Sequence, residues 1–396
     1  MNIAIVQTTL DARRGGAETS TLEMAGQLAA LGQTVTLLAA DVTPELQTRI
    51  SHDHSGTRAV SVLSPSGKPD PHAFARAVDR HLSTSRYDVV HAVTPCYAAD
   101  VYQPRGGTLI ETIERSVAIG RTPLERWLRR LGRRFNRRQR ALLEIEHDLL
   151  SRDPPPVVAA VSDYVLRQVA AHYPSAAARA RVVFNGVNFK PLEDDAAKDA
   201  RHALRGEFGL EANARCVLFV AHNFKLKGLA ALIAARAAHS PAAAGNSSDW
   251  TLIVAGRDRT RPYERLAERM GVASSIRFVG ATRPVSQLFA AADVLAHPTW
   301  YDPCSRVVLE ALCAGVPVVT TRCNGAAEAL TPGVHGEILD WPADPATLAR
   351  AIDRCLSQDC ATACRRDAHA FRERLSMRRH ATELLALYQK IAATHA

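Results

Sequence analysis

Short apolar segments alternate with helical segments in the second half of the chain, and this alternation constrains the fold more than any other feature. Strands are predicted at 216–221, 251–255, 276–279, 294–297 and 316–320, with a helix between each strand and the next. Apolar runs of this length, separated by helices, are typical of a parallel sheet that is covered on both faces. The sequence therefore predicts a doubly wound α/β domain.

A strand, a helix and a second strand also open the chain. The apolar run 2–7 predicts the first strand, 17–31 predicts a helix that Gly32 ends, and 34–40 predicts the second strand. A unit of this length joins two parallel strands by a right-handed crossover. The first half of the chain is therefore expected to form a domain of the same class.

The length of 396 residues exceeds the size at which a single hydrophobic core keeps growing, so two domains are expected. We expect an N-terminal domain over 1–186, a C-terminal domain over 187–372, and a final helix at 373–396 that packs back on the first domain. A polar and charged segment at 188–200 predicts the linker. The expected fold is α/β, with two Rossmann-like doubly wound domains facing a central cleft that binds ligands.

The composition argues against several other classes of protein. No apolar run reaches the roughly 18 residues of a membrane-spanning helix, and the first residues lack the basic segment of a signal peptide. The eight cysteines are scattered, which suits a reducing cytosol. We interpret Cys360 and Cys364 as helix-packing residues, because no pair of histidines accompanies them as in a zinc site. A cytoplasmic location is expected.

The strongest candidate site follows the predicted strand at 294–297. A loop carries Asp302, Cys304 and Ser305, a helix begins near Arg306, and Glu310 lies one turn further along it. The free amides at the start of a helix attract anions, so phosphates are expected there. Asp302 is then predicted to orient a sugar ring and Glu310 to hold a ribose. Alternatively, Asp302 only caps the helix and Glu310 is a solvated surface residue.

This segment resembles the acidic-x7-Glu motif of the retaining GT-B glycosyltransferases of family four. The usual form is Glu-Pro-Phe-Gly, an apolar helix with a second Glu, and then Ala-x-Ala-x-Gly-x-Pro-Val. The resemblance covers 297–320 and continues in Ala292-Asp293 and Asn185-Gly186-Val187. Asp302 replaces the first Glu, and Cys304-Ser305 replaces Phe-Gly. These departures concern sugar specificity more than the type of reaction.

The resemblance implies that a nucleotide sugar, expected to be a UDP-sugar, serves as co-substrate, with no metal and no other cofactor, and that Cys304, Ser305 and Arg306 help to bind this donor. The sugar would pass to an acceptor hydroxyl with its anomeric configuration retained. The chain is more narrowly similar to the lipopolysaccharide-core glucosyltransferases of that family, through a basic helix and the preceding residues Tyr97-Ala98-Ala99-Asp100-Val101. The expected acceptor is therefore a lipopolysaccharide core or another cell-envelope glycolipid.

Two lysines follow the predicted strand at 216–221, in the segment Asn223-Phe224-Lys225-Leu226-Lys227-Gly228. Fixed positive charge at this junction would stabilise the diphosphate that leaves during transfer. Lys227-Gly228 resembles a Lys-Gly pair of the family, whereas the family's upstream Arg is missing and Lys225 is a candidate replacement. The alternative is that both lysines are ordinary surface residues of a loop.

Two weaker candidates lie in the first half. Gly15, Gly16 and Glu18 follow the first strand and resemble the family's Gly-Gly-x-Glu loop, which faces the phosphates and the acceptor. A simple turn would have the same composition. His91, at the end of a predicted strand at 88–92, resembles a family His near the transferred sugar, although a single His is more often structural.

Arginines are concentrated in a stretch at 122–150 that predicts one long helix. Apolar residues interleave them at helical spacing, namely Trp127, Leu128, Leu131 and Phe135. The net charge is +9, and a local basic cluster implies an anionic partner. We expect this helix to bind an anionic membrane surface or the acceptor, through Arg126, Arg129, Arg130, Arg133 and Arg134. A solvated helix face is the alternative, and nucleic-acid binding is not expected because aromatic residues are only 6%.

The predicted protein is thus a hexosyltransferase that lies peripherally on the inner face of the cytoplasmic membrane. One rival is a GT-B sugar-nucleotide epimerase, which would release a free sugar without any acceptor. The other rival is a non-catalytic protein that binds sugar nucleotides or membrane surfaces.

Overall fold

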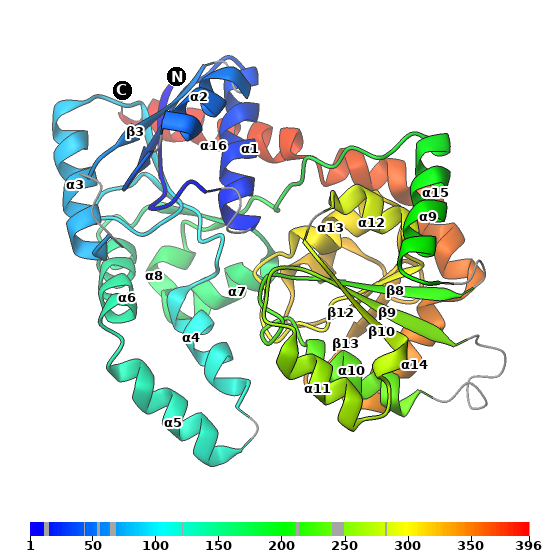
Figure 1. Cartoon of the computed structure of the whole chain (residues 1–396). Helices are drawn as coiled ribbons and strands as arrows, with labels where there is room; N and C mark the ends of the chain where they lie inside the picture. The colour runs from blue at the N-terminus through cyan, green and yellow to red at the C-terminus, as the bar shows by residue number, and fades with distance from the viewer. Residues whose placement is uncertain are drawn as a thin grey trace. The chain divides into compact units, whose positions relative to one another are not determined.

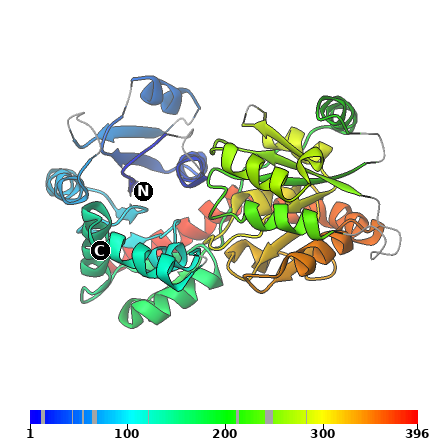
Figure 2. The same cartoon turned by 60° about the horizontal axis from the view of Figure 1, so that its bottom comes forward.

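The computed structural model describes the chain except for residues 12–15, 43, 54–55, 64–68, 121, 211–213, 240–248, 282 and 396. It contains two compact units (Figure 1). Unit 1 comprises Met1–Asn188 and Ser376–Ala396, and unit 2 comprises Phe189–Leu375. The termini of the chain therefore both belong to unit 1 (Figure 2). The chain changes unit close to the predicted boundaries at 186 and 372.

A seven-stranded parallel sheet forms the centre of unit 1, in the order β3-β2-β1-β4-β5-β6-β7. Its strands are β1 (Asn2–Val6), β2 (Thr34–Ala39), β3 (Thr57–Ser61), β4 (Val89–Ala92), β5 (Val101–Tyr102), β6 (Val157–Ala160) and β7 (Arg181–Val182). The residues of β1, β2, β4 and β6 are almost all buried, as expected for a parallel sheet with both faces covered.

The helices of unit 1 are α1 (Gly16–Ala30), α2 (Pro44–Asp53), α3 (Pro71–Thr84), α4 (Leu109–Ala118), α5 (Pro123–Arg134), α6 (Arg137–Leu150), α7 (Asp163–His172), α8 (Pro174–Ala177) and α16 (Met377–His395). The prediction of one long helix at 122–150 is wrong. The chain breaks at Phe135 and Asn136, because the Asn136 side chain accepts from the Gln139 amide at 3.1 Å and starts α6 as a cap.

The C-terminal helix α16 packs against α1 and completes the core of unit 1. Its buried apolar residues recur every three or four positions, which gives a continuous apolar stripe along the helix. These residues are Met377, Ala381, Leu384, Tyr388 and Ile391. Residues from the two ends of the chain thus share one core, as predicted for the final helix.

A six-stranded parallel sheet forms the centre of unit 2, in the order β10-β9-β8-β11-β12-β13. Its strands are β8 (Arg215–Val220), β9 (Trp250–Ala255), β10 (Ile276–Gly280), β11 (Val294–Ala296), β12 (Val318–Thr321) and β13 (Gly336–Leu339). The order reverses between β8 and β11, which are neighbours in space but not in sequence. Ligands of doubly wound sheets bind at this switch point, beyond the carboxyl ends of the strands.

Helices cover both faces of this sheet (Figure 1). One face carries α9 (Asp194–Glu207), α12 (Val285–Ala291), α13 (Arg306–Cys313) and α15 (Gln358–Arg374), and the other carries α10 (Leu229–Ala238), α11 (Arg261–Arg269) and α14 (Pro345–Cys355). The predicted linker at 188–200 is largely wrong, because α9 begins at Asp194. Arg201 of α9 donates to Asp293 at 2.7 Å and so fixes that helix to unit 2.

A glycine lets the loop after β8 lie against the loop after β11. Gly228 has a φ of 83°, and a Cβ atom built there would lie 2.0 Å from the carbonyl oxygen of Pro298. Beside it, the Leu226 carbonyl accepts from the Trp300 amide at 2.9 Å. The two loops at the switch point are therefore in backbone contact.

We expect Gly228→Ala to destabilise the protein by about 2 kcal/mol or more, because the left-handed φ and the overlap with Pro298 both oppose a side chain. Gly206→Ala is the matched control, since Gly206 lies in α9 with no heavy atom within 4 Å of a built Cβ. That control should be neutral or stabilising by about 0.5 kcal/mol. Chemical denaturation of both variants measures the difference, and equal stabilities would contradict the close contact.

None of the described helices is both long enough and apolar enough to cross a bilayer.

Candidate functional site

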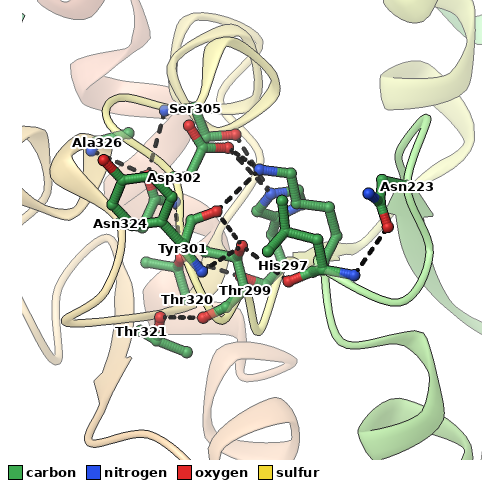
Figure 3. Close-up of polar contacts among 12 residues, drawn as sticks. Asn223, His297, Thr299, Tyr301, Asp302, Ser305, Thr320, Thr321, Asn324 and Ala326 are labelled. Carbon is green, nitrogen blue, oxygen red and sulfur yellow. Dashed lines mark hydrogen bonds and ion pairs between the residues drawn. The ribbon is translucent and has the colours of Figure 1, made fainter. Parts of the chain in front are cut away.

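An ammonium and a carboxylate meet where the loops after β8 and β11 lie together. The Lys227 Nζ atom lies 2.5 Å from Oδ2 of Asp302, and it donates to the Tyr301 carbonyl at 3.2 Å. Figure 3 shows Asp302 and Tyr301 in this loop. The side chains of Lys227 and Asp302 are 18% and 14% exposed. The pair is thus largely enclosed by protein, and both side chains keep some contact with solvent.

The charge of Asp302 depends on its neighbours. Burial raises the pKa of its carboxyl, but the Lys227 ammonium and then His297 lower the pKa further, so that it falls well below its usual range. Asp302 is therefore ionised at neutral pH and can only accept hydrogen bonds. The lowered pKa of Asp302 stabilises the folded protein at any pH above the pKa that this carboxyl has in the unfolded chain. This stabilisation is lost only as the pH falls through the lower pKa of Asp302 in the folded protein.

His297, which the sequence analysis did not select, contacts this pair. Its Nε2 atom lies 3.7 Å from Oδ2 of Asp302 and 3.4 Å from Oγ of Ser305, and its ring stacks on Phe219. Burial lowers the pKa of the imidazole, and Asp302 only partly opposes this shift. A neutral His297 can donate one hydrogen bond toward the loop. The feature of the sequence that could have revealed His297 is its position directly after the strand β11.

Asn324, which was also missed, holds the loop in place. Its Oδ1 atom accepts from the amides of Ser305 at 3.2 Å and Ala326 at 3.0 Å, and its Nδ2 atom donates to Thr320 at 3.0 Å (Figure 3). The Ser305 amide was predicted to hold a diphosphate, but in this structure it already donates to Asn324. Asn324 follows β12, the strand beside β11, so only the strand order brings it to Ser305.

Helix α13 begins directly after this loop. Ser305 is its N-cap residue, which contradicts the alternative that Asp302 caps the helix. Glu310 is only 17% exposed and accepts from Arg306 at 3.2 Å, so the alternative of a solvated surface residue is also wrong. Arg306, predicted to bind the donor, is placed as the partner of Glu310. Cys304 is buried beside Ser305.

A second recess lies beside the loop after β8. It has a volume of about 480 Å³ and is lined by His222, Asn223, Lys225, Asp258, Arg259, Pro262 and Tyr263. Lys225 is exposed and lines this recess. Lys225 and Arg259 give the recess two cationic side chains, which suits a polar or anionic group. Arg259 lies in a loop after β9 and had no motif to reveal it.

The predicted site residues of unit 1 are placed differently. Gly15 lies outside the described residues, while Gly16 begins α1 and Glu18 lies in its first turn. His91 of β4 is fully buried, and its Nδ1 atom is hydrogen-bonded to the Tyr388 hydroxyl of α16. Burial, followed by the charge of Arg105, lowers the pKa of His91 to about 3. This buried placement does not support the predicted contact with a sugar.

The arginine-rich helix α5 exposes apolar side chains. Leu124, Trp127 and Phe135 are 65%, 58% and 76% exposed, and Leu128 and Leu131 lie on the same stretch. Arg126 and Arg130 are exposed, Arg129 and Arg133 are partly exposed, and Arg134 ends the helix. Figure 1 shows α5 extending from α4 and α6 within unit 1. An apolar stripe flanked by arginines without a described covering element is unusual for a solvated helix.

Among the described residues, one group has the spacing of a metal site, namely Glu111, Glu114 and His172 in unit 1. Arg115 Nε donates to Oε1 of Glu111 at 2.6 Å, and His172 Nε2 lies 3.4 Å from Oε2 of Glu111. The Arg115 guanidinium already neutralises Glu111, so the contacts of Glu111 with Arg115 and His172 form an ion-pair network. We assign no metal to it.

Both halves of the chain match known families. Residues 14–190 match the family described as Glycosyltransferase Family 4, and residues 214–358 match the one described as Glycosyl transferases group 1. The lipopolysaccharide glucosyltransferase WaaG of Escherichia coli is 27% identical over 271 residues, which cover 68% of this chain and 65% of WaaG. The matched part is thus slightly less than two thirds of WaaG. A D-inositol 3-phosphate glycosyltransferase of Corynebacterium urealyticum is 31% identical over 60% of this chain and 58% of that protein.

Two solved structures resemble the whole chain. The crystal structure of WaaG, a glycosyltransferase involved in lipopolysaccharide biosynthesis, has a TM-score of 0.74 at 22% identity and covers 96% of this chain and 99% of WaaG. HepE of Anabaena, crystallised with UDP-glucose, has a TM-score of 0.68 at 20% identity and covers 99% of this chain and 98% of HepE. These likenesses show that the chain shares their fold of two parallel-sheet units.

Proposed function

Because this chain belongs to the GT-B glycosyltransferases of the family-four type, we propose that it transfers a sugar from a UDP-sugar to a cell-envelope glycolipid. The structure of HepE with UDP-glucose supports the choice of donor, and the similarity to WaaG supports a lipopolysaccharide core as acceptor. The transfer retains the anomeric configuration and needs no metal.

The Lys227–Asp302 pair at the switch point carries this proposal. The ionised Asp302 accepts hydrogen bonds from hydroxyls of the transferred sugar, and His297 and Lys227 hold its carboxylate in position. The Lys227 ammonium is then adjacent to the bond between the sugar and the diphosphate. As that bond breaks, negative charge grows on the diphosphate, and a fixed ammonium stabilises it.

The same groups support metal independence, and a front-face step accounts for retention. The sequence has no Asp-x-Asp triplet for a metal-bound diphosphate, and Lys227 supplies positive charge in its place. In the retaining step, the acceptor oxygen attacks the face from which the diphosphate leaves. The acceptor proton passes to the departing phosphate oxygen, while Glu310 on α13 holds the ribose of the donor.

The test begins with binding. We would measure the thermal stability of the chain with a panel of nucleoside diphosphates, where a ligand at 100 times its Kd adds about 2.7 kcal/mol. The preferred sugar nucleotide is then incubated with core glycolipid, with and without EDTA, and the product linkage is determined by NMR. We expect UDP to stabilise most, EDTA to have no effect, and the product to keep the donor configuration.

Other results of these assays would support one of the two rival functions, an epimerase or a non-catalytic binding protein. Release of a free, epimerised sugar without any need for acceptor would indicate an epimerase. Donor binding with neither transfer nor slow donor hydrolysis would indicate a non-catalytic binding protein. An inverted product linkage would contradict the retaining mechanism.

We further propose that α5 holds the enzyme peripherally on the inner face of the cytoplasmic membrane. Its exposed Trp127 and Phe135 are suited to the interfacial region of a bilayer, and the arginines beside them are suited to anionic headgroups. Each arginine near an anionic surface contributes about 1 kcal/mol. A few of them suffice for reversible binding and bring the enzyme to a glycolipid acceptor.

We expect the combined variant Arg129→Glu, Arg130→Glu and Arg133→Glu to weaken binding to anionic vesicles by about 10²-fold, since three contacts of about 1 kcal/mol are lost. Co-sedimentation with phosphatidylglycerol vesicles measures this change. Binding of the wild type should also fall between 0.1 M and 1 M salt, as the Debye length shortens from about 10 Å to about 3 Å.

The matched control reverses three arginines on α11 in unit 2, namely Arg261, Arg265 and Arg269, all of which are exposed. This control should sediment like the wild type. Donor hydrolysis should be unchanged in the α5 variant, because the Lys227–Asp302 pair lies in unit 2. Equal sedimentation with neutral and anionic vesicles would contradict the electrostatic role of α5.

A further inference from the structure

A cavity lies in unit 2 at the edge of the sheet where the strands begin. It has a volume of about 390 Å³, and its lining includes Arg215 at the start of β8, Asp293 before β11 and Pro317 before β12. Lys227 of the candidate transferase site follows the other end of β8. The six residues of that strand span about 20 Å, at roughly 3.3 Å per residue. The cavity is therefore separate from the Lys227–Asp302 pair.

Three arginines from three different elements line this cavity. Arg201 comes from α9, Arg215 from β8 and Arg365 from α15. Among the described residues of the lining, Asp293 is the only carboxylate. Three positive charges and one negative charge leave a net charge of +2 on the walls. Like charges that are gathered around a concave space focus the electric field, so this lining attracts anions.

The charge of Asp293 is already compensated from within the protein. Its Oδ1 atom accepts from Arg201 at 2.7 Å, and its Oδ2 atom accepts from the Cys216 amide at 2.8 Å and from Arg205 at 3.4 Å. Arg201 also donates to the Ala290 carbonyl at 3.1 Å, which fixes the wall formed by α9. A ligand therefore meets a carboxylate that two guanidinium groups already neutralise.

Arg365 lies in the first half of α15 and lines the cavity. Its guanidinium makes no hydrogen bond or ion pair with any residue that the structure describes. The next residue, Arg366, instead donates to both carboxylate oxygens of Asp367, at 2.7 and 2.8 Å. A guanidinium without an internal partner can offer its N–H groups in pairs to the oxygens of a phosphate.

We propose that this cavity binds a small phosphate monoester. The phosphate accepts hydrogen bonds from Arg365 and is attracted by the charge of Arg215. It lies near Gln358, at the start of α15, where the first amides of a 17-residue helix favour an anion. The organic part of the ligand lies against the apolar residues Val316 and Leu356. The volume is within the roughly 300–1,000 Å³ of small-molecule sites.

This function goes beyond sugar transfer, because the cavity and the candidate transferase site lie at opposite ends of β8. The cavity is built entirely from residues of unit 2. Its ligand therefore binds independently of donor and acceptor, and binding can be measured without either of them.

Isothermal titration of the full chain with ribose 5-phosphate tests this proposal. We expect ribose 5-phosphate to bind and uncharged ribose not to bind. Arg365→Ala should raise the Kd for ribose 5-phosphate by roughly 10–100-fold, since a hydrogen bond to a charged group is lost. Arg366→Ala is the matched control, because Arg366 is the neighbouring arginine, is also exposed and does not line the cavity. It should bind ribose 5-phosphate like the wild type.

A further variant separates the cavity from the transferase site. Lys227→Ala should bind ribose 5-phosphate with the wild-type Kd. Loss of binding in Lys227→Ala but not in Arg365→Ala would place the anion at the transferase site and overturn the proposal. No binding at all, an unchanged Kd in Arg365→Ala, or equal affinities for ribose and ribose 5-phosphate would also overturn it.

The Arg365→Ala result must not come from unfolding. Arg365 is exposed, so this variant should keep the melting temperature of the wild type, which thermal unfolding measures. The titration contains neither UDP-sugar nor acceptor, so its failure is distinguishable from failure of the proposed transferase activity.

Discussion

Lys227→Ala is expected to lower the turnover number by about 10²–10³-fold, which corresponds to about 2.7–4 kcal/mol of lost transition-state stabilisation. The reason is that the Lys227 ammonium is held at the switch point by Asp302 and the Tyr301 carbonyl. It is therefore in place before the diphosphate begins to leave. Donor affinity should fall less than turnover, because the charge on the diphosphate grows during the reaction. Steady-state kinetics with the preferred sugar nucleotide and glycolipid give both quantities.

Two comparisons make the Lys227 result specific. Lys198→Ala removes an exposed lysine of α9 in the same unit and should leave turnover unchanged. Lys225→Ala tests whether the lysine beside the second recess replaces the arginine of the family pattern, and it should raise the KM for donor more than it lowers turnover. If Lys227→Ala turns over like the wild type, Lys227 has no part in the mechanism.

The same variant should change the pH dependence of the reaction. In the wild type, Lys227 is the strongest influence that lowers the pKa of Asp302, whereas burial raises it. Without Lys227, the pKa of Asp302 should rise toward neutral pH. The activity that remains should therefore fall at a higher pH than in the wild type as the solution is acidified. A pH profile with the same acidic limb in both proteins would show that Lys227 does not control Asp302.

Glu310→Ala is expected to weaken binding of the nucleoside diphosphate by roughly 10–100-fold, since a hydrogen bond to a charged group contributes about 1.5–3 kcal/mol. Glu310 lies one turn inside α13, is largely enclosed, and is oriented by Arg306 at 3.2 Å. In this position its carboxylate is suited to the two hydroxyls of a ribose. Isothermal titration with UDP measures the change in Kd.

A structural loss must be separated from the loss of a ribose contact. Removing Glu310 leaves Arg306 without this partner in a largely buried position, which is itself destabilising. Glu310→Gln keeps the shape and one acceptor oxygen, so it should bind UDP more tightly than Glu310→Ala at similar thermal stability. Glu268→Ala, on the exposed side of α11, is the control for a simple change of charge. UDP binding equal to the wild type in Glu310→Ala would exclude the ribose role.

Much of the site was predictable because its parts are local in sequence. The loop with Asp302, the start of α13 and Glu310 lie within nine consecutive residues, and Lys227 lies next to a glycine at a strand-to-helix junction. Apolar periodicity likewise revealed the alternating strands and helices, since burial on both faces of a sheet selects that pattern. These features depend on short-range geometry, which a linear sequence contains.

The tertiary structure alone decided which distant residues join them. Asn324 reaches the Ser305 amide because β12 lies beside β11, and His91 is hydrogen-bonded to Tyr388 because α16 returns from the far end of the chain. These contacts depend on strand order and on packing between elements whose contacting residues are 19 and 297 positions apart, and no periodicity in the sequence encodes them.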